Sequence, residues 1–286
     1  MVTYKLNEEI VYIDGILGKK LERDVITELR KKDMDVVFAI AGKERSGKST
    51  FGQVLGGFIA AKLGTKFDET NICMTPDELR IRIEHAQKNE VIIYDEAHRG
   101  MGSTRALSEV NNVLRDLFME MGQLNLCVIV ILPSFFMLDK YIALHRTRGL
   151  FYVYMNSGQR GFWTYFNEKD KKKLYLKGKK TLDVNCVRFP NFRGRFYKKT
   201  PINEEVYRKK KRESFKRRER LTRSERYMEQ RDVLIIYMGK MMGLTQQRIS
   251  DILKTAGASI TRQEISLIQL KNRDVFEKFA SARRKI

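Results

Sequence analysis

Residues 36–50 read VVFAIAGKERSGKST, an apolar run rich in β-branched residues followed by a glycine-rich segment that ends in Lys-Ser-Thr. The run predicts a buried β-strand, and residues 49–63 predict a helix. Between them lies the spacing Gly42-x-x-x-x-Gly47-Lys48-Ser49, the pattern of a loop that binds phosphate. Glycines let the backbone wrap closely around a polyphosphate, and consecutive N–H groups with the helix N-terminus hold its negative charge.

This pattern assigns a chemical role to several side chains. Lys48 is expected to reach the β- and γ-phosphates of ATP, and the Ser49 hydroxyl to coordinate Mg²⁺. A chance glycine-rich loop is the alternative, but the flanking strand and helix favour a nucleotide site. The residues expected to contact the nucleotide are Gly42, Lys43, Glu44, Arg45, Ser46, Gly47, Lys48, Ser49 and Thr50.

A pair of carboxylates extends the nucleotide site toward hydrolysis. Asp95 and Glu96 follow the apolar residues 91–94, so they are expected at the carboxyl end of a buried strand, where ligands bind in doubly wound sheets. Asp95 would hold the Mg²⁺ shell, and Glu96 would orient the water that attacks the γ-phosphate. An acidic loop without catalytic function is the alternative. Residues 95–98 also spell Asp-Glu-Ala-His, a helicase signature that we treat as coincidence because the chain is too short for two helicase lobes.

Two further candidates follow the third apolar strand, residues 126–132. Ser134 stands where a polar side chain could sense the γ-phosphate, although an ordinary Pro-Ser turn explains it equally well. Arg146 and Arg148 follow a short predicted helix. In a ring of subunits either arginine could enter the neighbouring site and stabilise transition-state charge; surface arginines without a catalytic role are the alternative.

Strands that are apolar on both faces alternate with helices in the first half of the chain. Such alternation predicts an α/β fold with a mainly parallel sheet flanked by helices, of the kind found in P-loop NTPases. Residues 150–155 and 161–166 are rich in aromatic and β-branched residues and predict an antiparallel hairpin that extends the sheet. The expected organisation is an N-terminal extension over 1–34, an ATPase domain over 35–200, a basic linker or exposed helix over 201–228, and a helical module over 229–286.

The net charge of +21 is unevenly distributed along the chain. Counting Lys and Arg against Asp and Glu, residues 1–160 sum to +1, which leaves +20 for residues 161–286. Nine of the thirteen residues in 208–220 are Lys or Arg. A cationic half favours a polyanionic partner, nucleic acid before membrane, and a solvated lysine-rich surface is the alternative.

The last part of the chain has the pattern of a helix-turn-helix. Thr245 and Thr261 are predicted to cap two short helices, with a Gly-containing turn between them. In such modules the second helix enters the major groove of double-stranded DNA. A helical packing or oligomerisation module is the alternative. The expected core residues are Leu244, Ile249, Ile252, Leu253, Ile260, Ile265 and Ile268, and the expected DNA contacts are Thr261, Arg262, Gln263, Ser266 and Lys271.

Composition restricts the cellular setting. The three cysteines are widely spaced and show no metal-binding spacing, which favours a reducing compartment. No signal peptide is recognisable, and the longest apolar run, residues 126–138, contains Pro133 and Ser134 and is too short to span a bilayer. We therefore expect a cytoplasmic protein without membrane insertion.

The combination of residues 42–49, Asp95-Glu96 and a third strand ending near Ser134 resembles the additional-strand, catalytic-glutamate branch of P-loop ATPases. Within it, residues 132–139 followed by Arg146, and Phe192-x-Gly194-x-Phe196 with Tyr207 and Lys209, are similar to zonula-occludens-toxin-like ATPases and to viral packaging and DNA-translocation ATPases. The resemblance covers roughly residues 35–210. It implies ATP hydrolysis with Mg²⁺ in a homo-oligomer, such as a hexamer with active sites between subunits.

These observations predict a Mg²⁺-dependent ATPase that acts on DNA, as a motor for packaging, translocation or transfer in a virus or mobile element. Two alternatives stay open at this point. One is a replication initiator or helicase loader, and the other is an ATP-switched DNA-binding regulator with slow turnover.

Overall fold

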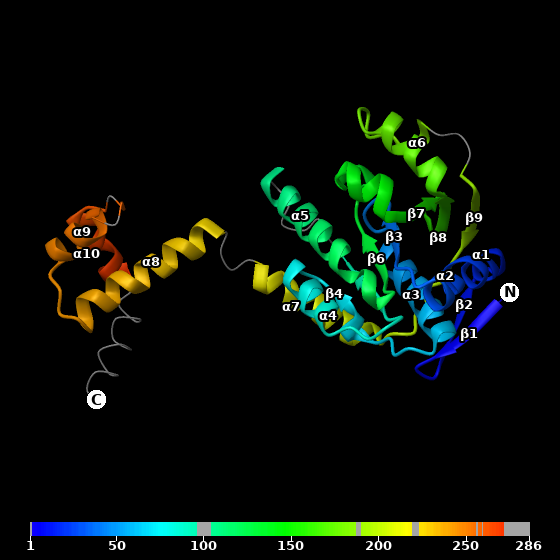
Figure 1. Ribbon diagram of the computed structural model, residues 1–286, viewed down its shortest axis with the longest axis horizontal. Coiled ribbons are helices and arrows are strands. Elements are labelled where there is room, and N and C mark those ends of the chain that lie inside the picture. The colour runs from blue at the N-terminus through cyan, green and yellow to red at the C-terminus, as the bar shows by residue number, and fades with distance from the viewer. Residues whose placement is uncertain are drawn as a thin grey trace. The chain divides into compact units, whose positions relative to one another are not determined.

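The computed structural model describes residues 2–95, 104–186, 190–218, 223–255, 257–258 and 260–271, and the chain divides into two compact units, Met1–Phe215 and Lys216–Ile286. The larger unit is a mixed α/β domain around a seven-stranded sheet (Figure 1). Residues 201–215, which the sequence placed in a linker, belong to this larger unit.

The sheet is mainly parallel. Its strand order is β4-β5-β6-β3-β7-β8-β9, in which the first five strands run parallel and β8 and β9 are antiparallel to their neighbours. The strands are β3 Val36–Ala41, β4 Ile72–Cys73, β5 Val91–Tyr94, β6 Cys127–Ile131, β7 Thr147–Asn156, β8 Gln159–Phe166 and β9 Phe192–Arg195. The predicted hairpin is therefore confirmed as β7–β8, which extends the parallel sheet at one edge.

Both faces of the sheet are buried. Alternate residues of β3 point to opposite sides of the sheet, and each side has its own hydrophobic core. Val36, Phe38 and Ile40 belong to one hydrophobic core, and Val37 and Ala39 belong to the other. Side chains of α3 Lys48–Leu63, α1 Gly15–Lys20, the π-helical turn Leu21–Ile26 and α2 Thr27–Lys31 fill the first core, while those of α4 Pro76–Glu84, α5 Thr104–Glu120 and α6 Glu168–Gly178 fill the second (Figure 1). Helices thus cover the sheet on both sides, as its apolar strands predict.

The N-terminal segment is an integral part of this domain. Its first residues form a hairpin of β1 Val2–Leu6 and β2 Glu9–Ile13, which the sequence analysis did not anticipate. Tyr4 and Val11 are buried in the core beside α3, and the Tyr4 hydroxyl donates to the Val54 carbonyl at 2.8 Å. The hairpin therefore packs on the same helix that follows the glycine-rich loop.

The smaller unit contains α8 Arg223–Lys240, α9 Gln246–Thr255 and α10 Arg262–Lys271, packed around a small apolar core. The helical module expected over 229–286 begins earlier, since α8 starts at Arg223. Ile252, expected in the core, is 44% exposed, because α9 turns its other face inward through Ile249 and Leu253. The core consists of Ile235, Ile249, Ile260, Ile265 and Ile268, with Met238, Leu244 and Leu253 packed against it.

Both predicted helix caps of the smaller unit are present. The Thr245 hydroxyl accepts from Arg248 N at 3.3 Å. Thr261 and Glu264 form a reciprocal capping box, in which Glu264 N donates to Thr261 Oγ1 at 3.3 Å and Thr261 N donates to Glu264 Oε2 at 2.8 Å. This box fixes the start of α10. It also holds the pKa of the Glu264 carboxyl below its usual range, because that carboxylate accepts from Thr261.

Candidate functional site

The loop between β3 and α3 has a shape that requires glycine at two positions. Gly42 has φ +151°, and a Cβ there would lie 2.0 Å from the Val153 carbonyl oxygen. Gly47 has φ +99°, and a Cβ there would lie 3.1 Å from the Phe196 ring. Side chains are excluded at both ends of the loop by backbone conformation and by close neighbours. The two glycines of the sequence pattern therefore set the shape of the turn.

Lys48 and Ser46 direct polar groups into this loop. Lys48 begins α3, and its Nζ donates to the carbonyls of Gly42 and Lys43, both at 2.8 Å. Ser46 is fully buried, and its hydroxyl has no hydrogen-bond partner among the described residues. The first N–H groups of any helix also have no partner within the helix, and the Gly47 cap supplies no side-chain acceptor to those of α3. The loop consequently presents a cation, N–H donors and a buried hydroxyl together.

An acidic side chain lies directly beside the loop. The Ser49 hydroxyl donates to Asp95 Oδ1 at 3.1 Å. Asp95 follows β5, its backbone N–H donates to the Cys73 carbonyl at 2.9 Å, and it is 1% exposed. The carboxyl ends of β3 and β5 thus bring Ser49 and Asp95 together, as expected from the parallel sheet. Glu96 and His98 lie outside the described residues.

These two oxygen-bearing groups fit a magnesium ion. Mg²⁺ is usually held by one or two carboxylate or hydroxyl groups together with substrate phosphates and water. Ser49 and Asp95 are of this type and are already in contact. Within the described part of the chain, no group of three or more His, Cys, Asp or Glu could hold a metal ion. The oxygen pair is thus the metal-binding candidate, with phosphate oxygens and water supplying the remaining ligands.

A helix from the basic segment reaches this carboxylate, which the sequence analysis did not anticipate. The Tyr207 hydroxyl, on α7 Glu204–Arg218, donates to Asp95 Oδ2. The Lys211 ammonium donates to the Tyr207 hydroxyl at 3.1 Å and lies 3.8 Å from Asp95 Oδ2. The sequence analysis named Tyr207 only within the family resemblance and gave it no role at the site, and 112 residues separate it from Asp95. The helix expected as one alternative over 201–228 is therefore present as α7, and most side chains of its first half are exposed, but Tyr207 is buried against the domain.

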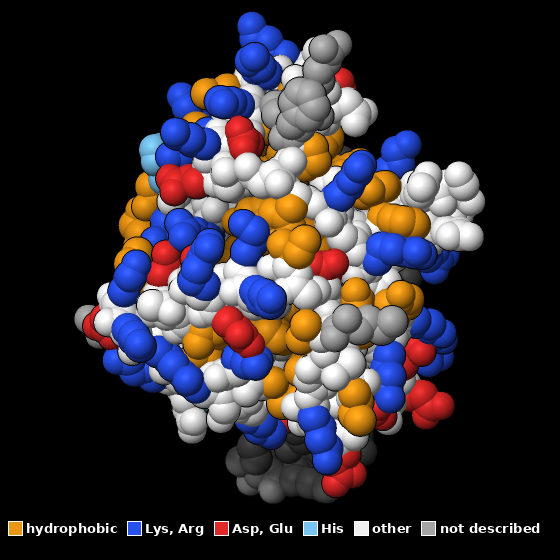
Figure 2. Space-filling view, turned by 90° about the vertical axis from the view of Figure 1, so that its right-hand side faces the viewer, with side chains coloured by type: hydrophobic (Ala, Val, Ile, Leu, Met, Phe, Trp, Pro, Cys, Tyr) orange, Lys and Arg blue, Asp and Glu red, His pale blue; other side chains and the backbone are white. Residues whose placement is uncertain are grey.

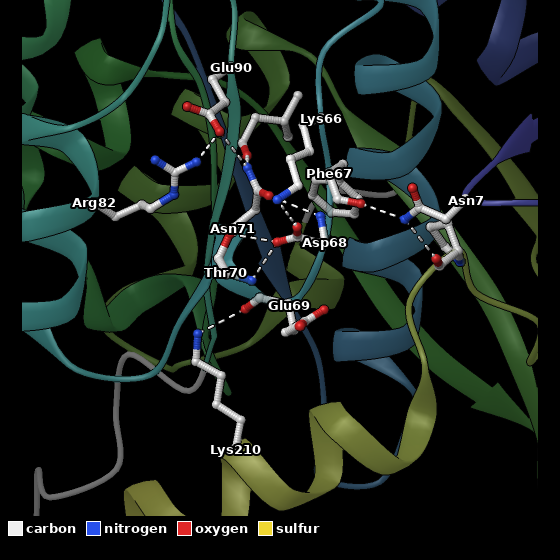
Figure 3. Close-up of polar contacts among 12 residues, drawn as sticks. Asn7, Lys66, Phe67, Asp68, Glu69, Thr70, Asn71, Arg82, Glu90 and Lys210 are labelled. Atoms are coloured by element: carbon white, nitrogen blue, oxygen red, sulfur yellow. Dashed lines mark hydrogen bonds and ion pairs between the residues drawn. The ribbon is translucent and has the colours of Figure 1, made fainter.

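Several contacts besides that of Tyr207 hold this segment to the domain. Lys210 Nζ donates to the Glu69 carbonyl at 2.8 Å. Figure 3 shows this contact and Asn7, which reaches across from the N-terminal hairpin. Asn7 Nδ2 donates to the carbonyls of Phe67 at 2.7 Å and Pro201 at 3.2 Å. Ile202 is buried in the core. These contacts do not involve the Tyr207 hydroxyl, so we expect α7 to stay packed when that hydroxyl is removed.

A cavity of about 320 Å³ adjoins the start of α3. It is lined by Thr50 and Gln53 from the first turns of the helix, and by Lys198, Lys199, Thr200 and Tyr207 from the segment that follows β9. Lys199 pairs with Glu9 at 2.7 Å, and Lys198 with Glu204 at 3.6 Å. Most of its lining residues are polar or charged, and one of them, Thr50, lies in the first turn of α3, just after the loop.

Of the remaining candidates, Ser134 lies near the loop. The Gly42 N–H donates to the Pro133 carbonyl at 3.3 Å, which places the end of β6 beside the glycine-rich turn. The Ser134 hydroxyl accepts from Phe136 N at 3.4 Å and caps the short helix Phe135–Met137. Ser134 thus has a structural role, in addition to its position at the carboxyl edge of the sheet.

Arg146 and Arg148 are not brought to the loop of their own chain. Arg146 pairs with Asp35, which precedes β3, and Arg148 pairs with Glu28 at 2.9 Å. Both arginines therefore lie near the amino ends of the parallel strands, whereas the loop lies at the carboxyl ends. The length of β3, about 20 Å, separates the two positions. A contribution to a neighbouring subunit's site stays a prediction.

The described DNA-contact candidates are accessible on α10. Thr261, Arg262, Gln263 and Ser266 are exposed, and Lys271 is the last residue of the helix. The Thr261 hydroxyl, however, is already engaged in the capping box. On the face that Figure 2 shows, Lys and Arg side chains are spread among apolar and fewer acidic side chains, without a single cationic patch.

Comparison with known proteins adds no family to these observations, since no family model and no curated protein matches the chain. Among the described residues, none of the helices is both long enough and apolar enough to cross a membrane.

Proposed function

We propose that the larger unit binds ATP with Mg²⁺ and hydrolyses it, and that the basic C-terminal region engages double-stranded DNA. One arrangement supports the nucleotide site. Lys48, Ser49 and Asp95 lie together at the carboxyl ends of the parallel strands, beside a turn that requires two glycines. The loop would hold the phosphates, and the cavity beside Thr50 and Gln53 would hold the nucleoside, since its volume is within the range of ligand pockets.

Hydrolysis requires charge stabilisation and an oriented water. Bound Mg²⁺ would withdraw charge from the phosphate oxygens. The Lys48 ammonium would exchange its carbonyl partners for phosphate oxygens, and Ser49 with Asp95 would fix the metal position. Glu96, the next residue along the chain, is proposed to orient the attacking water. A motor for DNA packaging or translocation, assembled as a ring, is the process we favour.

An ATPase assay on the full chain, with and without double-stranded DNA, tests the enzymatic proposal. We expect Mg²⁺-dependent phosphate release that DNA stimulates. Glu96→Gln should retain ATP binding and lose at least about 100-fold in rate, the lower end of general-base contributions. Lys48→Ala should lose both binding and turnover, while Lys19→Ala, at an exposed position on α1, should behave as wild type. Normal turnover by Glu96→Gln would show that the base is assigned wrongly.

The DNA-binding proposal rests on charge and on the three-helix unit. Residues 208–220 would neutralise phosphates and give salt-sensitive binding without sequence preference, and α10 would supply base contacts as the second helix of a helix-turn-helix. Removing residues 229–286 should abolish sequence preference and leave salt-sensitive binding. Unchanged preference in a binding-site selection experiment contradicts the role of α10.

A further inference from the structure

Both oxygens of the Asp95 carboxylate accept hydrogen bonds from hydroxyl groups on different helices. Oδ1 accepts from Ser49 at the start of α3, and Oδ2 accepts from Tyr207 on α7. The carboxylate is 1% exposed, so solvent cannot replace either donor. Hydrogen bonds to both oxygens fix the orientation of this buried carboxylate about its Cβ–Cγ bond. In that orientation Oδ1 faces Ser49.

The Tyr207 hydroxyl also separates a cation from this carboxylate. Lys211 lies one helical turn after Tyr207, and its Nζ donates to the tyrosine oxygen. Lys211 Nζ and Asp95 Oδ2 form an ion pair at 3.8 Å, a distance beyond hydrogen-bond length. Without the hydroxyl, the ammonium could approach Oδ2, rotate the carboxylate and compete with a metal ion for its charge.

We propose that Tyr207 is a positioning residue that orients Asp95 for magnesium, so that the metal site is complete only when α7 is packed in place. This inference rests on the proposed nucleotide site and adds to it a residue from outside the sequence pattern. Groups that hydrogen-bond a metal ligand typically change metal affinity by about 10- to 100-fold when they are removed. Tyr207→Phe removes only the hydroxyl, and α7 stays anchored through Lys210, Ile202 and the Asn7–Pro201 contact.

The experiment is a titration of Mn²⁺, as a spectroscopic substitute for Mg²⁺, into the full chain with saturating ADP, in which free Mn²⁺ is followed by electron paramagnetic resonance. Tyr207→Phe should weaken Mn²⁺ binding by about 10-fold or more. Replacing Lys211 by Gln in the same variant should recover part of the affinity, because the competing ammonium is removed. Tyr197→Phe, at a half-exposed tyrosine that packs against Tyr12, is the matched control and should match wild type.

The outcomes separate this inference from the proposed function. If wild type binds Mn²⁺ with ADP and Tyr207→Phe binds it equally well, the hydroxyl has only a structural role and the inference is overturned. Tighter binding by Tyr207→Phe also overturns it, because the hydroxyl would then obstruct the metal. If wild type binds neither ADP nor Mn²⁺ with ADP, the proposed nucleotide site itself fails. Coincident thermal unfolding curves for the variants confirm that affinities are compared between folded proteins.

Discussion

Substitution of Gly42 by alanine tests whether the backbone of the glycine-rich loop is fixed by its neighbours. Gly42 has φ +151°, a conformation that only glycine adopts readily, and alanine there costs about 1–3 kcal/mol in backbone strain. Its Cβ would also lie 2.0 Å from the Val153 carbonyl oxygen, a backbone atom that cannot rotate away. Relief of such overpacking costs about 1–3 kcal/mol more. We therefore expect Gly42→Ala to lower the free energy of unfolding by about 2–6 kcal/mol.

Gly64→Ala provides a matched control. Gly64 ends α3 with φ +73°, but no atom lies within 4 Å of where its Cβ would be. Alanine there bears only the left-handed backbone cost, about 1–2 kcal/mol. The excess destabilisation of Gly42→Ala over Gly64→Ala therefore reflects the contact between residue 42 and β7, together with the less favourable backbone conformation at Gly42.

Urea unfolding followed by tryptophan fluorescence measures both variants. The chain has one tryptophan, and Trp163 is fully buried in β8, so its emission reports on the larger unit alone. For a unit of this size, 1 kcal/mol corresponds to about 2–4 °C in Tm, which gives an independent thermal check. If Gly42→Ala destabilises the protein no more than Gly64→Ala does, the loop backbone can move away from Val153 and the reasoning is refuted.

Two other predictions concern buried or capping side chains. Burial lowers the pKa of Lys171, whose ammonium donates to the Ala143 and Leu144 carbonyls, to about 8. Between pH 8 and 10.5 the unfolded chain therefore binds more protons than the folded chain. As the pH rises through that interval, the free energy of unfolding of wild type should increase by about 3 kcal/mol relative to that of Lys171→Met. Urea unfolding measures both pH profiles, and parallel profiles would contradict this prediction. Thr261→Ala should destabilise α10 by about 1 kcal/mol through loss of its cap, measured as faster amide hydrogen exchange in that helix, with exposed Ser266→Ala as the control. Equal exchange in both variants would show that the capping box contributes nothing to the helix.

Local patterns in the sequence were sufficient for much of the fold. The buried strands β3, β5 and β6 were recognisable as apolar runs because both faces of a parallel sheet are covered by helices. The start of α4 is also set by neighbouring residues, since Thr75 Oγ1 accepts from Glu78 N at 3.2 Å and Pro76 suits the first turn. These features depend on a few neighbouring residues, so a local pattern is enough to identify them.

The sequence was less informative about which segments belong to the packed domain. The β1–β2 hairpin and α7 are short or highly charged, and each is stabilised by contacts with residues distant in the chain. Ile252 was expected in the core because it is apolar, yet the orientation of α9 against its two neighbours leaves it exposed. Burial in a small helical unit is determined by how its helices pack together, and the apolar character of one side chain does not determine it.

For the candidate site, the sequence by itself determined the glycine-rich turn, Lys48, Ser49 and the position of Asp95 after a buried strand. Chain order and strand direction are enough to place these groups at one edge of a parallel sheet. Only the tertiary structure decided that Arg146 and Arg148 lie near the amino ends of the strands, away from the loop, and that Tyr207 donates to Asp95. The physical reason is that these contacts join residues far apart in sequence, and no local periodicity encodes which distant side chain will satisfy a buried carboxylate.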